Sequence, residues 1–299
     1  MTTLSNTLNS PVPAVKKPPT VWATIIKNVR RRPLGAVAAV IVLTLVIVAL
    51  FAPLLAPFDP YKINSAMLLK APNWQNWMGT DEYGRDIMSR VIWGSRISLL
   101  VGVLAVLLGT TTGAVLGLIC GYFGGRIDYV IQRLMDVLMA FPGLILALAM
   151  VAALGPNITN VILALSITIM PGPSRVIRAS AMALRESPFV DAAHNLGYSN
   201  ARILFRHIMP NCAAPYIIIA TSALGGAILA EAGLSFLGLG TPPPMPSWGA
   251  MLSGSAQRFM TEAPWLAVFP GLAITLVVFG FSFLGDALRD MLDPRLRTR

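Results

Sequence analysis

The chain contains little charge and almost no cysteine or histidine for its 299 residues. Charged residues make up 12% of it, against about a quarter in soluble domains, whereas hydrophobic residues make up 55%. This composition excludes an ordinary soluble domain. It indicates an integral membrane protein, whose partner over most of its surface is the lipid bilayer.

With so few cysteine and histidine residues, few side chains could bind a metal or react as a thiol. Cys120 and Cys212 both fall near the predicted cytoplasmic ends of spans, where disulfides are rare. His194 and His207 have no acid or cysteine arranged around them in the sequence. We therefore expect no metal site, no catalytic residues and no bound cofactor.

The apolar segments have almost no ionisable groups in their central turns. Asp136, Glu231 and Asp286 all lie close to the ends of the predicted spans. A carrier driven by protons or sodium usually needs a relay near the membrane midplane, so an external energy source is favoured over a self-sufficient carrier or channel. A membrane-embedded enzyme would need a nucleophile with a base, or a metal cluster, and no such set is present.

Nucleotide chemistry is also absent from the chain itself. The sequence has no Gly-x-x-x-x-Gly-Lys-Ser/Thr loop, the motif that cradles nucleotide phosphates. We therefore expect the chain to bind no nucleotide and to be no ATPase itself.

Six apolar stretches are long enough to cross about 30 Å of hydrocarbon as helices. Runs this continuous do not show the alternation of a membrane β-barrel, so the predicted fold is all-α and polytopic, with six transmembrane helices. The stretches lie near residues 34–55, 97–120, 134–154, 158–177, 210–230 and 265–284.

The distribution of Lys and Arg predicts the orientation and explains the net charge of +10. Cytoplasmic loops of membrane proteins carry an excess of these residues, and most of the 23 lie in segments that are inside if both termini are cytoplasmic. Because they are spread over several loops, nucleic acid is not an expected partner. The outer segments hold only Lys62, Lys70, Arg85, Arg90, Arg96 and Arg258.

The chain organises around these spans. Residues 1–33 form a Pro-rich cytoplasmic tail that we expect to be partly disordered, and residues 34–55 form the first transmembrane helix. Residues 56–95 are an extracytoplasmic segment. Residues 96–299 form a core of five transmembrane helices, which includes a cytoplasmic loop at about 180–209.

Two outer motifs allow several interpretations. Thr80 with Asp81 and Glu82 is typical of a helix start, while a hard cation bound there is disfavoured by the neighbouring Arg85 and Arg90. The Pro-rich loop at 232–264 could gate a pore, receive a substrate-delivering protein or form a rigid cap.

The second span carries a stripe of small residues at every fourth position. Such a stripe lets another helix approach closely, and in lipid this packing holds helices together. We therefore expect this face to pack inside the bundle. Its members are Ala105, Gly109, Gly113, Gly117 and Gly121.

The polar segment between the fourth and fifth spans predicts a short helix with a sharp end. Ser187 can cap it, Pro188 suits its first position and Asp191 lies near the positive end of its dipole. Gly197 can take the left-handed conformation that ends a helix. A second amphipathic piece over 199–208 follows. Composition alone leaves an interfacial linker and a docking surface equally open.

Here the chain resembles a known family. Asp191-Ala192-Ala193, three residues, Gly197 and then Pro210 resemble the EAA loop of ABC-importer permeases, whose pattern is Glu-Ala-Ala, three residues, Gly, nine residues, Ile, any residue, Leu-Pro. The chain departs from it at Asp191, His207 and Met209, which keep the charge sign and most of the apolar run. Further segments are similar to the C-type permease of the dipeptide, oligopeptide and nickel importers: residues 79–86, 121–125, 141–143, 234–240 and 284–295.

The resemblance implies a type I ABC-importer permease bundle in a bacterial-type inner membrane. It implies that the chain forms half of a pore for dipeptides or oligopeptides, with nickel or glutathione as alternatives. The implied partners are a homologous second permease, two cytoplasmic ATP-binding subunits and an extracytoplasmic substrate-binding protein. The implied ATPase-coupling residues are Ser187, Asp191, Ala192, Ala193, Leu196, Gly197 and Pro210.

Overall fold

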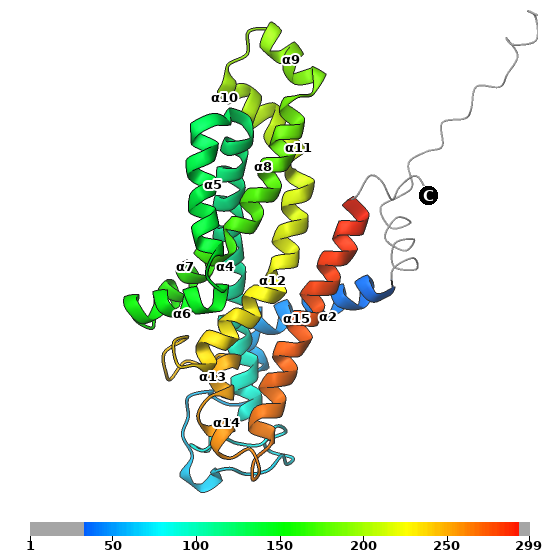
Figure 1. Cartoon of the computed structure of the whole chain (residues 1–299). Helices are drawn as coiled ribbons and strands as arrows, with labels where there is room; N and C mark the ends of the chain where they lie inside the picture. Colours follow the sequence, from blue (N-terminus) through cyan, green and yellow to red (C-terminus); the bar gives the residue numbers. More distant parts are fainter. Residues whose placement is uncertain (1–32, 293–299) are drawn as a thin grey trace, which may run out of the picture. The chain divides into compact units, whose positions relative to one another are not determined.

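The computed structural model describes residues 33–292. The predicted tail, apart from Pro33, and the basic residues after position 292 lie outside that range. Within it the only regular elements besides helices are one isolated antiparallel bridge, Thr80–Asp86, so the all-α prediction is confirmed (Figure 1). The elements are α2 (Pro33–Leu50), α3 (Ala52–Leu55), η1 (Ser65–Met67), α4 (Ile87–Phe123), α5 (Gly125–Met139), α6 (Gly143–Leu154), α7 (Ile158–Ile169), α8 (Pro171–Arg185), α9 (Pro188–Asn195), α10 (Asn200–Ile203), the π-helix η2 (Leu204–Ile208), α11 (Met209–Asn211), α12 (Ala213–Phe236), α13 (Trp248–Leu252), α14 (Ser255–Arg258) and α15 (Trp265–Leu292).

The apolar helices account for the predicted membrane spans. Among the described residues, α2, α4, α12 and α15 are each long and apolar enough to cross a bilayer. Two bent pairs, α5 with α6 and α7 with α8, bring the number to six when each pair is taken as one span.

The third span is not the single straight helix predicted at residues 134–154. It breaks between α5 and α6 with a bend of 90°. Pro142 stands directly before α6 and has no backbone N–H to continue the hydrogen bonding of α5. α7 and α8 meet at a milder bend of 42° at Met170 and Pro171, where the prolines of the sequence interrupt the helix.

Helix α4 is longer than the predicted span at 97–120. Its 37 residues extend for about 55 Å at about 1.5 Å per residue, well beyond about 30 Å of hydrocarbon. The prediction that Thr80 starts a helix is wrong, because Asp86 caps α4 by accepting hydrogen bonds from the Ser89 amide at 2.8 Å and the Ser89 hydroxyl at 2.7 Å. Thr80 instead forms the isolated bridge with Asp86, and its carbonyl accepts a hydrogen bond from the Trp265 indole at 3.2 Å.

The small-residue stripe of α4 lies directly against the backbone of α7 and α8. A Cβ atom added at any of its four glycines would come closer than 3.0 Å to a backbone carbonyl oxygen. From one contact to the next, both partners move four residues further along the chain. Helix α4 therefore runs in the same direction as α7 and α8. The pairs are Gly109 with Ser166, Gly113 with Met170, Gly117 with Ser174 and Gly121 with Arg178. Ala105, which begins the stripe, is fully buried in a neighbouring apolar cluster.

The other half of the bundle packs α12 on α15. Its core residues include Ile228, Trp248, Val277 and Phe281, and Val42 of α2 packs against them. Next to this core, Glu231 of α12 is fully buried and accepts a hydrogen bond from the Ser235 hydroxyl at 2.7 Å.

The close packing of the stripe predicts that one added methyl group lowers the stability of the fold. Gly117→Ala should lower the unfolding midpoint of the purified protein, because the methyl group forces α4 away from the Ser174 carbonyl. Gly172→Ala, in α8, is the matched control, since an added Cβ there has no neighbour within 4 Å. The control should be neutral or stabilising by up to about 1 kcal/mol from helix propensity. Equal midpoints for both variants would contradict the packing described.

The buried Glu231 predicts a difference between two substitutions. Glu231→Ala leaves the Ser235 hydroxyl without its partner and should cost about 1–3 kcal/mol, whereas Glu231→Gln keeps an acceptor and should cost less. Thermal unfolding in detergent measures both, with the exposed Glu262→Ala as control. The interpretation fails if the Ala and Gln variants unfold at the same temperature.

Candidate functional site

The segment between α8 and α12 folds into a compact hairpin of short helices. It comprises α9, α10, η2 and α11, and α9 and α10 lie at the opposite end of the bundle from α13 and α14 (Figure 1). All seven residues expected to couple to an ATPase lie in this segment.

The start of α9 follows the sequence pattern except at its cap. Pro188 occupies the first turn and Asp191 lies in it as well. Ser187 has the extended backbone of a capping residue, but its hydroxyl makes no cap hydrogen bond and donates instead to the Ala183 carbonyl of α8 at 3.4 Å. The predicted side-chain cap is therefore wrong, and Ser187 ties α9 back to α8.

The end of α9 is a Schellman motif. The Tyr198 amide donates to the Ala193 carbonyl at 3.1 Å, and the Gly197 amide donates to the His194 carbonyl at 2.9 Å. Gly197 has a φ of 76°, and an added Cβ would meet nothing within 4 Å. Glycine is required here by backbone conformation and not by lack of space.

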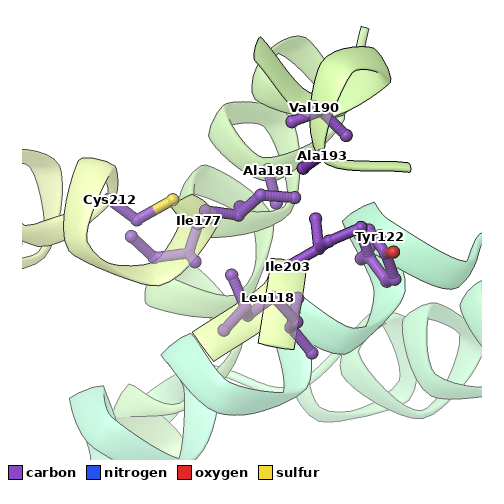
Figure 2. Close-up of a cluster of buried hydrophobic side chains, with 10 residues drawn as sticks. Leu118, Tyr122, Ile177, Ala181, Val190, Ala193, Ile203 and Cys212 are labelled. Atoms are coloured by element: carbon purple, nitrogen blue, oxygen red, sulfur yellow. The ribbon is translucent and has the colours of Figure 1, made fainter. Parts of the chain in front are cut away.

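The inner face of α9 joins a buried cluster that includes α4 and α8. Val190 and Ala193 point into it, one turn apart (Figure 2). They meet Leu118 of α4, Ile177 of α8 and Ile203 of α10 there. Because this core is close-packed, α9 is fixed to the α4–α8 pair and not merely tethered by its loops.

The outer face of α9 is exposed and mixes one acid with apolar side chains. Asp191 and Ala192 lie on it, and Phe189 is exposed as well. Leu196, just past the helix end, has 73% of its surface exposed. The exposed face of α9 and its end therefore present two large apolar side chains, Phe189 and Leu196, beside a single acid.

Of the predicted coupling residues, Ala193 and Pro210 do not share that face. Ala193 is buried in the cluster beneath α9 and is not accessible to a partner protein. Pro210 lies in α11 and lines an apolar cavity of about 350 Å³ together with Tyr216 of α12.

Polar contacts reinforce the attachment of the hairpin. The Tyr122 hydroxyl, at the end of α4, donates to Asn200 Oδ1 of α10 at 2.9 Å. The Arg185 guanidinium donates to the Tyr122 carbonyl at 3.1 Å. One residue of α4 therefore holds both α8 and α10.

The family follows from comparison with known proteins. Residues 113–298 match the family model described as the binding-protein-dependent transport system inner membrane component. The chain belongs to this family. Residues 20–72 match a second model, the N-terminal transmembrane domain of oligopeptide transport permease C. The permease fold and the inner-membrane location predicted from the sequence are thereby confirmed.

Relatives of this permease cover nearly its whole length. The dipeptide transport system permease protein DppC of Alkalihalophilus pseudofirmus is 44% identical over 277 residues, 93% of this chain and 91% of the relative. A putative peptide transport system permease protein of Brucella suis is 40% identical over 297 residues, 99% of both chains. The glutathione transport system permease protein GsiD of Escherichia coli is 44% identical over 279 residues, 93% of this chain and 92% of the relative.

The sequence did not reveal two ion pairs that brace this permease below the hairpin. Arg178 of α8 forms a two-pronged ion pair with Asp128 of α5, and Arg175 pairs with Asp136 at 2.6 Å. The signal was present in the spacing, since Asp128 and Asp136 fall on one face of α5. It could not be interpreted without knowing that α5 folds back beside α8.

The Schellman motif predicts a conformational cost at one position. Gly197→Ala should raise the hydrogen-exchange rate of the amides of 190–198 in the full chain, because a side chain in the left-handed region costs about 1 kcal/mol or more. Gly197→Asn should change it less, because Asn tolerates that region better than Ala. Identical exchange in the wild-type and Gly197→Ala proteins would show that the turn does not hold α9.

Proposed function

We propose that this permease is one of two homologous membrane subunits of an ATP-driven importer of dipeptides or oligopeptides. It forms half of the translocation pore, two cytoplasmic ATP-binding subunits dock below it, and an extracytoplasmic binding protein delivers substrate from above. Both chain termini lie in the cytoplasm, on the side of the α9 hairpin.

One observation supports the coupling role most strongly. The outer face of α9, with Asp191, Phe189 and Leu196, is exposed, while Val190 and Ala193 on its inner face are locked into the cluster shared with α4 and α8. A partner that moves α9 therefore moves two membrane helices with it. This is how ATP-driven closure of the ATPase pair would be converted into alternation of the pore.

The orientation is supported by charge. The end of α8 and the segment between α8 and α12 contribute Arg185, Arg202 and Arg206, as cytoplasmic loops do. Energy supply from separate subunits is supported by the absence of a phosphate-binding loop in the sequence.

Peptide transport is favoured by the relatives named for dipeptides and peptides and by the match to the oligopeptide permease model. The glutathione permease, at 44% identity, keeps a second candidate substrate that is itself a short peptide derivative. Nickel import has no such relative among those described above.

Coupling through α9 is tested by changing one exposed residue. In liposomes containing both permeases, both ATPases and the binding protein, ATP should drive uptake of a labelled dipeptide. Leu196→Asp should reduce that uptake at least about tenfold, since a desolvated interface contact of this type is worth about 1.4 kcal/mol or more. Because Leu196 is exposed, the variant should insert and unfold like the wild type.

The matched control lies at the other end of the bundle. Met260→Asp, also at an exposed apolar residue, should leave co-purification of the ATPase subunits unchanged, whereas Leu196→Asp should reduce it. Full uptake and full co-purification with Leu196→Asp would overturn the coupling role. Uptake without ATPase subunits would favour a self-sufficient carrier.

A further inference from the structure

A polar cavity lies at the end of the bundle opposite α9. Its volume is about 430 Å³, within the range of small-molecule sites of roughly 300–1,000 Å³. Two segments distant in sequence face each other across it, the turn at 79–86 before α4 and the loop that follows α12. Both stood out in the sequence, and the coupling mechanism uses neither. Its lining includes Glu82, Arg85, Arg90, Thr241, Ser253 and Leu266.

Both arginines of the cavity wall face the same carboxylate, Asp81. Asp81 accepts hydrogen bonds from the amides of Tyr83 and Arg85, both at 2.9 Å. Its second oxygen accepts from Arg85 Nε at 2.7 Å and lies 3.6 Å from Arg90 Nε. Two arginines thus share one fully engaged carboxylate.

Arg85 keeps more free Nη donors than Arg90, whose Nη1 donates to the Pro60 carbonyl at 3.0 Å. The guanidinium of Arg85 lies 4.5 Å from the centre of the Tyr83 ring, and its side chain is only 16% exposed. Among the described residues its hydrogen bonds use Nε alone, so both Nη groups are unpartnered at the cavity. A guanidinium fixed in this way suits a carboxylate, which it can bind through two parallel hydrogen bonds.

Glu82 supplies the opposite charge. It lines the same cavity, is half-buried, and has no ion pair or hydrogen bond to any residue at 33–292. Its carboxylate is therefore available to an ammonium group that enters the cavity.

We propose that this cavity binds a short zwitterionic peptide by its two ends, with the carboxylate on Arg85 and the ammonium group on Glu82. The inference rests on the proposed function for its ligand class. Leu266 and Met251 provide apolar lining for the ligand's side chains. The site would receive peptide on the outer side of the permease and would disfavour ligands with one end blocked, since Arg85 or Glu82 would then lack a partner.

The test is protection of a cysteine placed in the cavity. Ser253→Cys puts a thiol on the lining, and the native Cys120 and Cys212 are buried, so a maleimide should label position 253 first in the full chain in nanodiscs. Saturating dialanine should slow this labelling at least about threefold. N-acetyl-dialanine and dialanine amide should protect far less at the same concentration.

Glu82→Gln in the same background should abolish protection by dialanine, and because Glu82 has no partner in the described chain the variant should fold normally. Arg85→Gln should do the same. The exposed Glu262→Gln and Arg258→Gln are the charge-matched controls and should retain it. Absence of protection by dialanine, or equal protection by the blocked forms or in Glu82→Gln, would overturn the proposal.

The labelling assay tests the cavity, and the uptake assay tests the importer function, so a negative result in one does not decide the other. ATP-driven peptide uptake without protection of Cys at position 253 would reject the cavity and leave the importer function intact. Protection without uptake in the complete system would retain the binding site and reject the proposed function.

Discussion

The backbone contact between α4 and the α7–α8 pair is the constraint on which the rest of the structure depends. Four glycines remove every side chain from one face of α4, so that face meets the carbonyl groups at Ser166 and at the three positions that follow it at the same spacing. In lipid, where apolar transfer does not drive helices together, such close packing is the main source of cohesion. This close contact runs from Gly109 to Gly121, along the half of α4 that leads to the α9 hairpin.

The two ends of the permease carry different features. At one end, α9 is attached to the α4–α8 pair by the cluster around Val190 and Ile203 and by the hydrogen bonds of Tyr122. At the other end, Asp86 caps α4, and the turn before it forms one wall of the charged cavity. Under the proposed coupling, a displacement of α9 would act on α4, whose other end borders the cavity.

The sequence predicted the helical class, the glycine stripe and the turn at Gly197, because each depends on local composition or spacing. The six predicted spans agree with the structure when each bent helix pair is counted as one span. The sequence missed the 90° bend, because one proline does not reveal how far the chain turns. It misplaced the start of α4 because Thr80 and Asp86 are both good caps, and the Thr80 hydroxyl is instead engaged by the backbone of Lys70 and Met67. The pairing of α5 with α8, and the meeting of residues 82 and 253 at one cavity, depend on contacts between distant segments that no local pattern encodes.

The central claim is that α9 and the α4–α8 pair move as one body. It is tested most directly by the distance between spin labels at His194 and Met182, both exposed, in the complete importer with and without bound ATP. The account predicts one distance distribution that is the same in both states, while the distance from His194 to its counterpart on the second permease changes. A shift of the His194–Met182 distance on ATP binding would show that α9 moves independently and would contradict it.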